Sequence, residues 1–200
     1  MKILVTAFEP FNKEKINASQ EVLKNLPGFN VMQKIVLPVV FNECFQEVYK
    51  LLENASFDYI LMLGESGGRT SVSLERIAVN LADASIPDNK GKVPHGEKIF
   101  PDGENAYFTT LNLKTAKDAL NENGIPVQIS NSAGLYVCNN LFYGVMYYID
   151  RHNLKTKAGF MHIPFLERQT VHKPHIASIS LQSAVSAVST LIALMEKGTL

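Results

Sequence analysis

The 200-residue chain has 46% hydrophobic and 19% charged residues, the balance of an ordinary globular domain. Its 19 basic and 19 acidic residues cancel, so neither nucleic acid nor a membrane surface is expected as a main partner. Two cysteines are too few for a disulfide framework and favour a reducing compartment, the cytoplasm. The N-terminus lacks the layout of a signal peptide, and no stretch is apolar and long enough to span a bilayer. We expect one domain over residues 1–200.

Short apolar runs alternate with amphipathic segments along the chain. Strands are predicted at residues 2–7, 31–37, 59–63, 127–130 and 157–163, with a further strand-like run at 74–81. Helices are predicted at 20–26, 41–53, 114–123, 138–149 and 181–197, while residues 83–113 are rich in loops. This alternation predicts an α/β fold with a mostly parallel sheet covered on both faces. A loop excursion as long as 83–113 is typical of a segment that covers a site or contacts another subunit.

Cys138 is predicted to lie in the first turn of a helix, directly after a strand and a turn of small residues (NSAG). The unpaired N–H groups and the positive dipole end of a helix favour a thiolate over a thiol. Cys138 is therefore a candidate nucleophile. The alternative is that Cys138 is a buried residue that only packs in the core. We give that interpretation to Cys44, which lies on the apolar face of its own helix.

A base and an orienting carboxylate can be found elsewhere in the chain. His162 ends the strand at 157–163, and sites in such sheets form beyond the carboxyl ends of the strands, so it is a candidate base. Glu75 sits inside an apolar run and needs a partner, either Arg76 or another cation, or a catalytic histidine. Glu75, Cys138 and His162 would form a complete set for acyl transfer. No metal is expected, because closely spaced ligand pairs are missing.

Two loops next to these strands offer further candidates. GESGGRT after Leu63 has three glycines, which allow a close backbone approach or a tight turn. It lacks the Lys-Ser/Thr of a phosphate loop, so a nucleotide site is weakly supported. The loop after Ala7 carries Phe8 and Phe11, which either pack beneath the loop or line a pocket.

Several motifs resemble those of the pyroglutamyl peptidase I (pyrrolidone-carboxylate peptidase) family of cysteine peptidases. They are TAFEPFNKEKINAS, GESGGR, LERIAVN, IPDN, NSAGLYVCNNLFYG and GFMHIPF, which span nearly the whole chain. The resemblance implies a single-domain, three-layer α/β/α sandwich that removes an N-terminal pyroglutamyl residue from peptides. It further implies a homotetramer or homodimer without a cofactor. The family's catalytic residues fall on Glu75, Cys138 and His162, and its substrate pocket falls on Phe8, Phe11, Asn17, Ile86, Tyr136 and Val137.

The chain departs from the family pattern at positions near the site. Where the family usually has GQAGGR and ARIPDN, this chain has Glu65 in place of the glutamine and Ser85 in place of the arginine. The resemblance puts Glu65 beside the substrate, where a carboxylate disfavours the thiolate of Cys138 and favours a protonated His162. Loss of the arginine weakens orientation or charge stabilisation. Tyr136 stands where the family often has phenylalanine.

The sequence thus predicts a cysteine peptidase acting through a thioester on the pyroglutamyl carbonyl. His162 would take the thiol proton or pair with the thiolate, Glu75 would orient the imidazole, and N–H groups at the helix start would receive the oxyanion. The alternative is a repurposed or weakly active homologue that binds a cyclic or peptide-end ligand, as Glu65 and Ser85 suggest. A third interpretation is a cysteine hydrolase acting on another small amide.

Overall fold

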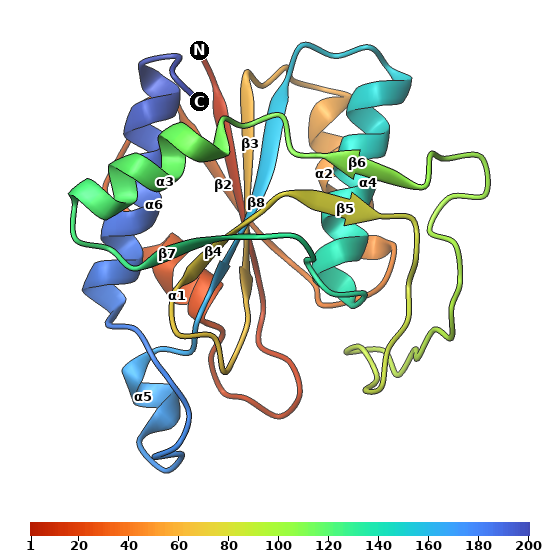
Figure 1. Cartoon of the computed structure of the whole chain (residues 1–200). Coiled ribbons are helices and arrows are strands. Elements are labelled where there is room, and N and C mark those ends of the chain that lie inside the picture. The colour runs from red at the N-terminus through yellow and green to blue at the C-terminus, as the bar shows by residue number, and fades with distance from the viewer.

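A six-stranded sheet forms the middle layer of the computed structural model, which describes all 200 residues (Figure 1). The strands lie in the order β2-β1-β3-β8-β4-β7. Their bounds are β1 (Ile3–Phe8), β2 (Met32–Leu37), β3 (Tyr59–Glu65), β4 (Val72–Glu75), β7 (Val127–Ser130) and β8 (Lys157–Ile163). The first four strands in this order are parallel. β1, β3 and β8 are short apolar runs buried on both faces, which is why they tolerate helices on either side, whereas β2 is a partly exposed edge strand.

Helices cover both faces of the sheet (Figure 1). The helices α2 (Glu43–Leu52) and α4 (Val137–Arg151) lie on one face, together with an antiparallel pair of strands, β5 (Ile77–Val79) and β6 (Ala106–Phe108). The helices α1 (Ala18–Asn25), α3 (Leu113–Glu122) and α6 (Leu181–Glu196) lie on the other, and the short α5 (Glu167–Thr170) projects at one end. The predicted α/β class with three layers is confirmed.

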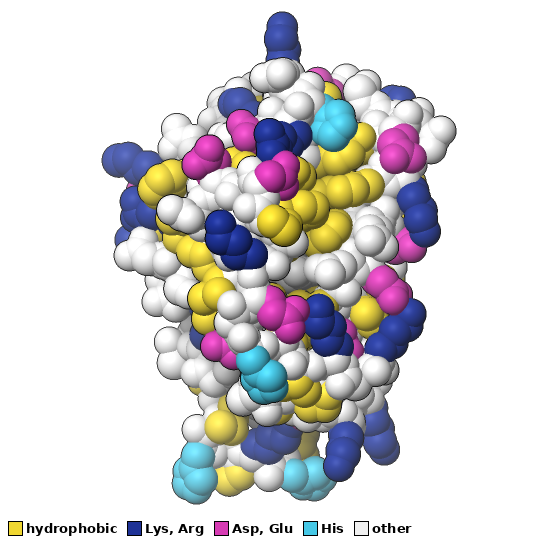
Figure 2. Space-filling model, turned by 90° about the vertical axis from the view of Figure 1, so that its right-hand side faces the viewer, with side chains coloured by type: hydrophobic (Ala, Val, Ile, Leu, Met, Phe, Trp, Pro, Cys, Tyr) yellow, Lys and Arg dark blue, Asp and Glu magenta, His cyan; other side chains and the backbone are white.

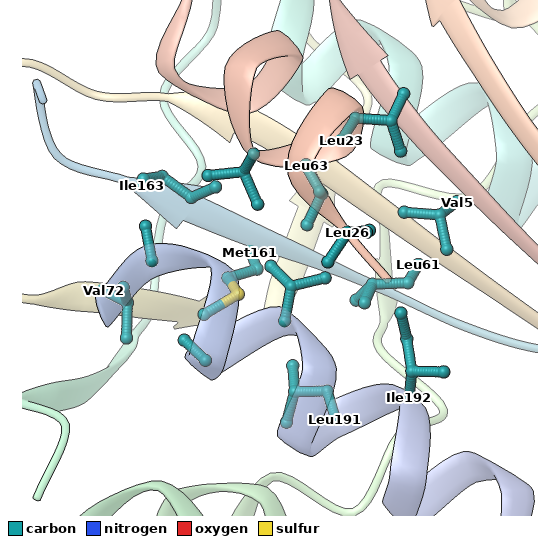
Figure 3. Close-up of a cluster of buried hydrophobic side chains, with 14 of the residues drawn as sticks. Val5, Leu23, Leu26, Leu61, Leu63, Val72, Met161, Ile163, Leu191 and Ile192 are labelled. Carbon is teal, nitrogen blue, oxygen red and sulfur yellow. The ribbon is translucent and has the colours of Figure 1, made fainter. Parts of the chain in front are cut away.

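Alternating side chains of each central strand supply the two halves of the core. Leu61, Leu63 and Met161 point towards α6, where Leu191 and Ile192 meet them (Figure 3). Their even-numbered neighbours on β3 and β8 point to the opposite face, towards α4. Full burial of one such side chain contributes roughly 1.5–3 kcal/mol, so each face holds its helices firmly. His162 is even-numbered on β8 and therefore faces α4.

The structure departs from the sequence-based expectations in three places. β4 and β7 are parallel to each other but β4 runs antiparallel to β8, so the end of β7 does not join the carboxyl edge of a fully parallel sheet. The segment 83–113 contains a strand, β6, which pairs with β5 through backbone hydrogen bonds. The helix α5 was not predicted, because four residues are too few to show a helical period.

Candidate active site

Glu75 and His162 meet on the α4 face of the sheet because of the antiparallel register of β4 and β8. Glu75 lies opposite Phe160, two residues before His162, so the two side chains are diagonal neighbours on one face. Nδ1 of His162 lies 2.7 Å from Oε1 of Glu75. Both residues are buried, and this hydrogen bond fixes the tautomer that leaves Nε2 of the imidazole free to exchange a proton.

Arg69 binds the same carboxylate oxygen from the glycine-rich loop after β3. Its Nη1 lies 2.7 Å from Oε1 of Glu75, and its Nη2 donates to the carbonyl of Ser132 at 3.4 Å. Arg76, the partner considered from the sequence, is exposed. Glu75 therefore has both kinds of partner that were weighed, a cation and a histidine, but the cation is a residue that sequence reasoning missed.

Cys138 is the second residue of α4, as predicted, and lies against the sheet at Gly64. A Cβ atom on Gly64 would lie 3.0 Å from Sγ of Cys138 and only 2.7 Å from the ring of Phe160. Gly64 in turn pairs with His162 in the register of β3 and β8. The glycine is therefore required for close approach, and it brings the thiol over the strand position next to the imidazole.

The start of α4 is held by two buried asparagines that follow the cysteine. Asn139 accepts from the backbone N–H of Val79 at 2.9 Å and donates to the carbonyls of Val79 and Leu81. Asn140 accepts from the backbone N–H of Asn42 at 2.8 Å. Sequence reasoning missed both. Adjacent asparagines in the first turn of an otherwise apolar helix were the signal, because buried amides need partners.

Burial opposes ionisation of both the thiol and the imidazole. Burial raises the pKa of Cys138 to about 12, with Glu75 and Glu65 adding to the effect. Burial also lowers the pKa of His162, despite the opposing influence of Glu75. For Glu75, burial is outweighed by His162 and Arg69, and its pKa lies below the usual range. Desolvation of Cys138 therefore opposes the thiolate that the helix start favours.

A small apolar pocket lies beside the thiol. Its lining residues are Phe8, Phe11, Asn17, Val39, Glu65, Tyr136, Val137 and Cys138. All but one of the residues predicted for the substrate pocket are brought together here. Ile86 is not among them, and Val39, which directly follows β2 and Pro38, was missed. Its position beyond the end of a parallel strand was the available signal.

Glu65, at the end of β3, is the charged member of this pocket. Its Oε2 accepts from the backbone N–H of Ala18 at 2.6 Å and from Nε2 of Gln169 at 2.8 Å. Its Oε1 is buried and has no partner. Burial raises the pKa of Glu65 above its usual range, although both hydrogen bonds act in the opposite direction.

The excursion that begins at residue 83 is hydrogen-bonded to the wall of the pocket, although none of its residues lines it. Asp88 accepts from the backbone N–H of Phe41 at 2.9 Å, and the backbone N–H of Asn89 donates to the carbonyl of Val39. The hydroxyl of Tyr136 donates to the carbonyl of Pro87 at 2.9 Å, so it ties the pocket wall to this loop. Ser85, which replaces the family arginine, is exposed and makes no side-chain hydrogen bond. The loop thus meets the expectation that it borders a site.

The site brings together a thiol at a helix start, an imidazole and a buried carboxylate at one end of an α/β/α sandwich. This is the arrangement of a cysteine hydrolase. The chain belongs to the pyroglutamyl peptidase family, whose model matches residues 1–197.

No group of three or more histidine, cysteine or acidic side chains is arranged to hold a metal ion. None of the helices combines the length and hydrophobicity needed to cross a bilayer.

Similar proteins carry the corresponding names. A pyrrolidone-carboxylate peptidase of Fusobacterium nucleatum is 45% identical over 194 residues, which cover 96% of this chain and 91% of that protein. One from Thermosipho melanesiensis is also 45% identical, covering 94% and 95%. Among solved structures, a mutant pyrrolidone carboxyl peptidase of Pyrococcus furiosus has a TM-score of 0.93 at 39% identity, with both chains fully covered. Pyroglutamyl peptidase I of Bacillus amyloliquefaciens has a TM-score of 0.91 at 37% identity, covering 94% and 93%.

Proposed function

We propose that this protein is a cysteine peptidase that removes an N-terminal pyroglutamyl residue from peptides. The observation that carries the proposal is the 2.7 Å contact of His162 with Glu75, at a sheet edge where Cys138 packs on Gly64 beside an apolar pocket. The pocket suits a flat, uncharged lactam ring. It disfavours a charged free amine, because most of its lining is apolar and burial favours the neutral form of Glu65, its one carboxyl group. Glu65 and Ser85 leave all three proposed catalytic residues in place.

The proposed reaction begins with neutral partners, because the pKa of Cys138 is raised and that of His162 is lowered. Nε2 of His162 takes the thiol proton as Sγ of Cys138 attacks the pyroglutamyl carbonyl, and the imidazolium then protonates the leaving amine. Water, activated by His162, hydrolyses the thioester. Backbone N–H groups in the first turn of α4 stabilise the oxyanion, since they lack partners within the helix.

The test of this function is turnover of a fluorogenic pyroglutamyl amide beside prolyl and glutaminyl amides of the same fluorophore. We expect release of the fluorophore from the pyroglutamyl amide only. The prolyl amide carries a charged amine in its ring, and the glutaminyl amide carries one at the end of its chain. Comparable turnover of the prolyl amide would contradict the proposed specificity. Tight binding of the pyroglutamyl amide without turnover would favour a repurposed binder.

Arg69 is proposed as a positioning residue for the catalytic pair. Replacing it in Arg69→Met removes the charge beside Glu75 and should lower the rate roughly tenfold, the scale of one charge-assisted hydrogen bond. Because Arg69 lowers the pKa of His162, the acid limb of the pH–rate profile should also move to higher pH. Arg69→Lys keeps the positive charge, so its acid limb should stay close to that of the unaltered enzyme. Exposed Arg76→Met is the control, and an unmoved limb in Arg69→Met would contradict the role.

We also propose that the chain forms a homodimer or homotetramer in the cytoplasm. Phe108 on β6 is 65% exposed, and it borders a groove that Met146, Ile149 and Leu154 line beside α4. Figure 2 shows yellow hydrophobic side chains gathered in the upper part of the side of the molecule that carries α2 and α4. Exposed apolar surface of this kind is typical of a subunit contact. Both cysteines are free, as a reducing cytoplasm allows.

The mass in solution tests this assembly. Sedimentation should give a multiple of the chain mass for the unaltered protein. Phe108→Ser should lower that mass at equal protein concentration, whereas exposed Val171→Ser, on the projecting end near α5, should not. A monomer in the unaltered protein would contradict the proposal.

A further inference from the structure

The carboxylate of Glu75 has one oxygen with two partners and one oxygen with none. Its Oε1 lies 2.7 Å from Nδ1 of His162 and 2.7 Å from Nη1 of Arg69. Its Oε2 is buried and accepts no hydrogen bond. A buried carboxylate oxygen without a donor is costly, so a donor within reach is favoured to turn towards it.

Ser130, the last residue of β7, carries the hydroxyl that is placed to serve this oxygen. The parallel register of β4 and β7 pairs Ser130 with Glu75. Neighbouring strands lie about 4.8 Å apart, so paired side chains stand next to each other on the same face of the sheet. The backbone N–H of Arg76 donates to the carbonyl of Ser130 at 2.8 Å and holds the two strand ends together. The hydroxyl of Ser130 is also close enough to help lower the pKa of Glu75.

The turn after β7 does not need the hydrogen of this hydroxyl. Oγ of Ser130 donates to the carbonyl of Ser132 at 3.0 Å and accepts from the backbone N–H of Ser132 at 3.3 Å. The same carbonyl receives Nη2 of Arg69 at 3.4 Å, so it has two donors while Oε2 of Glu75 has none. Turning the hydroxyl towards Glu75 leaves every one of these groups with a partner, and a carboxylate is a stronger acceptor than a carbonyl.

We propose that Ser130 is a positioning residue of the catalytic pair, whose hydroxyl donates to Oε2 of Glu75. Both oxygens of the carboxylate are then held, which prevents the rotation that would carry Oε1 away from Nδ1 of His162. This role rests on the proposed function, in which Glu75 orients the imidazole. Ser130 itself touches neither the substrate nor the thiol, and it acts through Glu75.

The same hydrogen bond makes proton uptake by the pair depend on Ser130. A donor to a carboxylate favours its ionised form. Without that donor, the first proton that Glu75 and His162 take up together binds more readily, whichever of the two groups holds it. Removal of the hydroxyl should therefore raise the pH at which the pair becomes protonated.

Few other charged or titratable groups face Glu75. Arg69 does so from the loop after β3 and keeps its charge throughout. Cys138 does so from α4, but burial raises its pKa to about 12, so little of its thiol is ionised at neutral or acid pH. β7 contributes no charged side chain. A change in protonation below neutral pH therefore reports on the pair itself.

The test follows the imidazole of His162 by ¹H–¹⁵N NMR from about pH 8 to about pH 4, with the His162→Gln protein identifying its signals. We expect Ser130→Ala to raise the midpoint of the titration by about one pH unit, the scale of a hydrogen bond to a charged group. The acid side of the pH–rate profile for a pyroglutamyl amide should move in the same direction. The rate at neutral pH should fall by less than about tenfold.

Two variants of nearly the same shape separate the hydroxyl from the packing of residue 130. Ser130→Thr keeps the hydroxyl and Ser130→Val replaces it with a methyl group, and both residue types suit a strand. Only Ser130→Val should show the raised midpoint. Gln128→Ala is the control, because it removes a donor on the same strand whose amide binds Ser73 and not Glu75. Its midpoint should equal that of the unaltered protein.

The results separate this role from the proposed function. An unmoved midpoint in Ser130→Ala, or equal midpoints in Ser130→Thr and Ser130→Val, overturns the inference even where the unaltered enzyme cleaves a pyroglutamyl amide. A raised midpoint that Ser130→Thr restores supports the hydrogen bond. If the unaltered protein then cleaves no pyroglutamyl amide, the hydrogen bond stands and the proposed function is overturned.

Discussion

Cys138→Ser should lose at least about a thousandfold in turnover of a pyroglutamyl amide, because the proposed nucleophile is removed and a serine hydroxyl is a far weaker one at this position. The fold should survive, since Sγ and Oγ are similar in size and Cys138 is only half-buried. Thermal unfolding of both proteins measures this. The variant should also still bind 2-pyrrolidone, because the pocket lining is otherwise unchanged.

Cys138→Ala is the companion variant, because it leaves no hydroxyl that might act in place of the thiol. Equal residual rates in the two variants would mean that the remaining turnover owes nothing to residue 138. Retention of the wild-type rate in Cys138→Ser, with the fold intact, would remove Cys138 from the mechanism.

His162→Gln should lower turnover at least about a hundredfold, the usual scale for loss of a general acid–base. Because burial raises the pKa of Cys138 to about 12, little of the thiol is ionised near neutral pH, so attack without a base is rare. The residual rate should rise about tenfold for each pH unit, because it follows the thiolate. Steady-state rates across pH measure both effects.

The unaltered enzyme should behave differently across the same range. Its rate requires neutral His162, and burial lowers the pKa of that residue. In the pH–rate profile, the fall in rate on the acid side should therefore begin below the ordinary pH range of histidine titration. Above that fall the rate should be level. His95→Gln, an exposed histidine on the 83–105 excursion, is the matched control and should keep this profile. A level profile in His162→Gln at an undiminished rate would assign the base to another residue.

Much of the fold follows from local patterns. β7 and β8 have the predicted bounds, and Cys138 stands in the first turn of α4, because short apolar runs and turn residues are local signals. The reversed direction of β4 depends on which strand it pairs with, and its own sequence does not carry that information. β6 is three residues long and shows no alternation that separates it from the surrounding loop.

Some parts of the site could likewise be predicted from local sequence, and others depend on the tertiary structure. Residue types and strand ends pointed to Glu75 and His162, but the second partner of Glu75 depends on a loop conformation that brings Arg69 back to the sheet. The burial that opposes a thiolate at Cys138 is a tertiary property, which the helix start alone does not determine. Glu65 was recognised as a departure, but its free oxygen emerged only once Ala18 and Gln169 were seen to occupy the other one.

The most direct test of the central claim, that the thiol of Cys138 cleaves the pyroglutamyl bond, is titration of the unaltered enzyme with iodoacetamide. Turnover of a pyroglutamyl amide and the extent of alkylation at each cysteine are followed together by peptide mass mapping. Buried Cys44 is the internal reference. We predict that turnover falls in proportion to alkylation of Cys138, with Cys44 unmodified and with 2-pyrrolidone slowing both losses. Full turnover after complete alkylation of Cys138 would contradict the account.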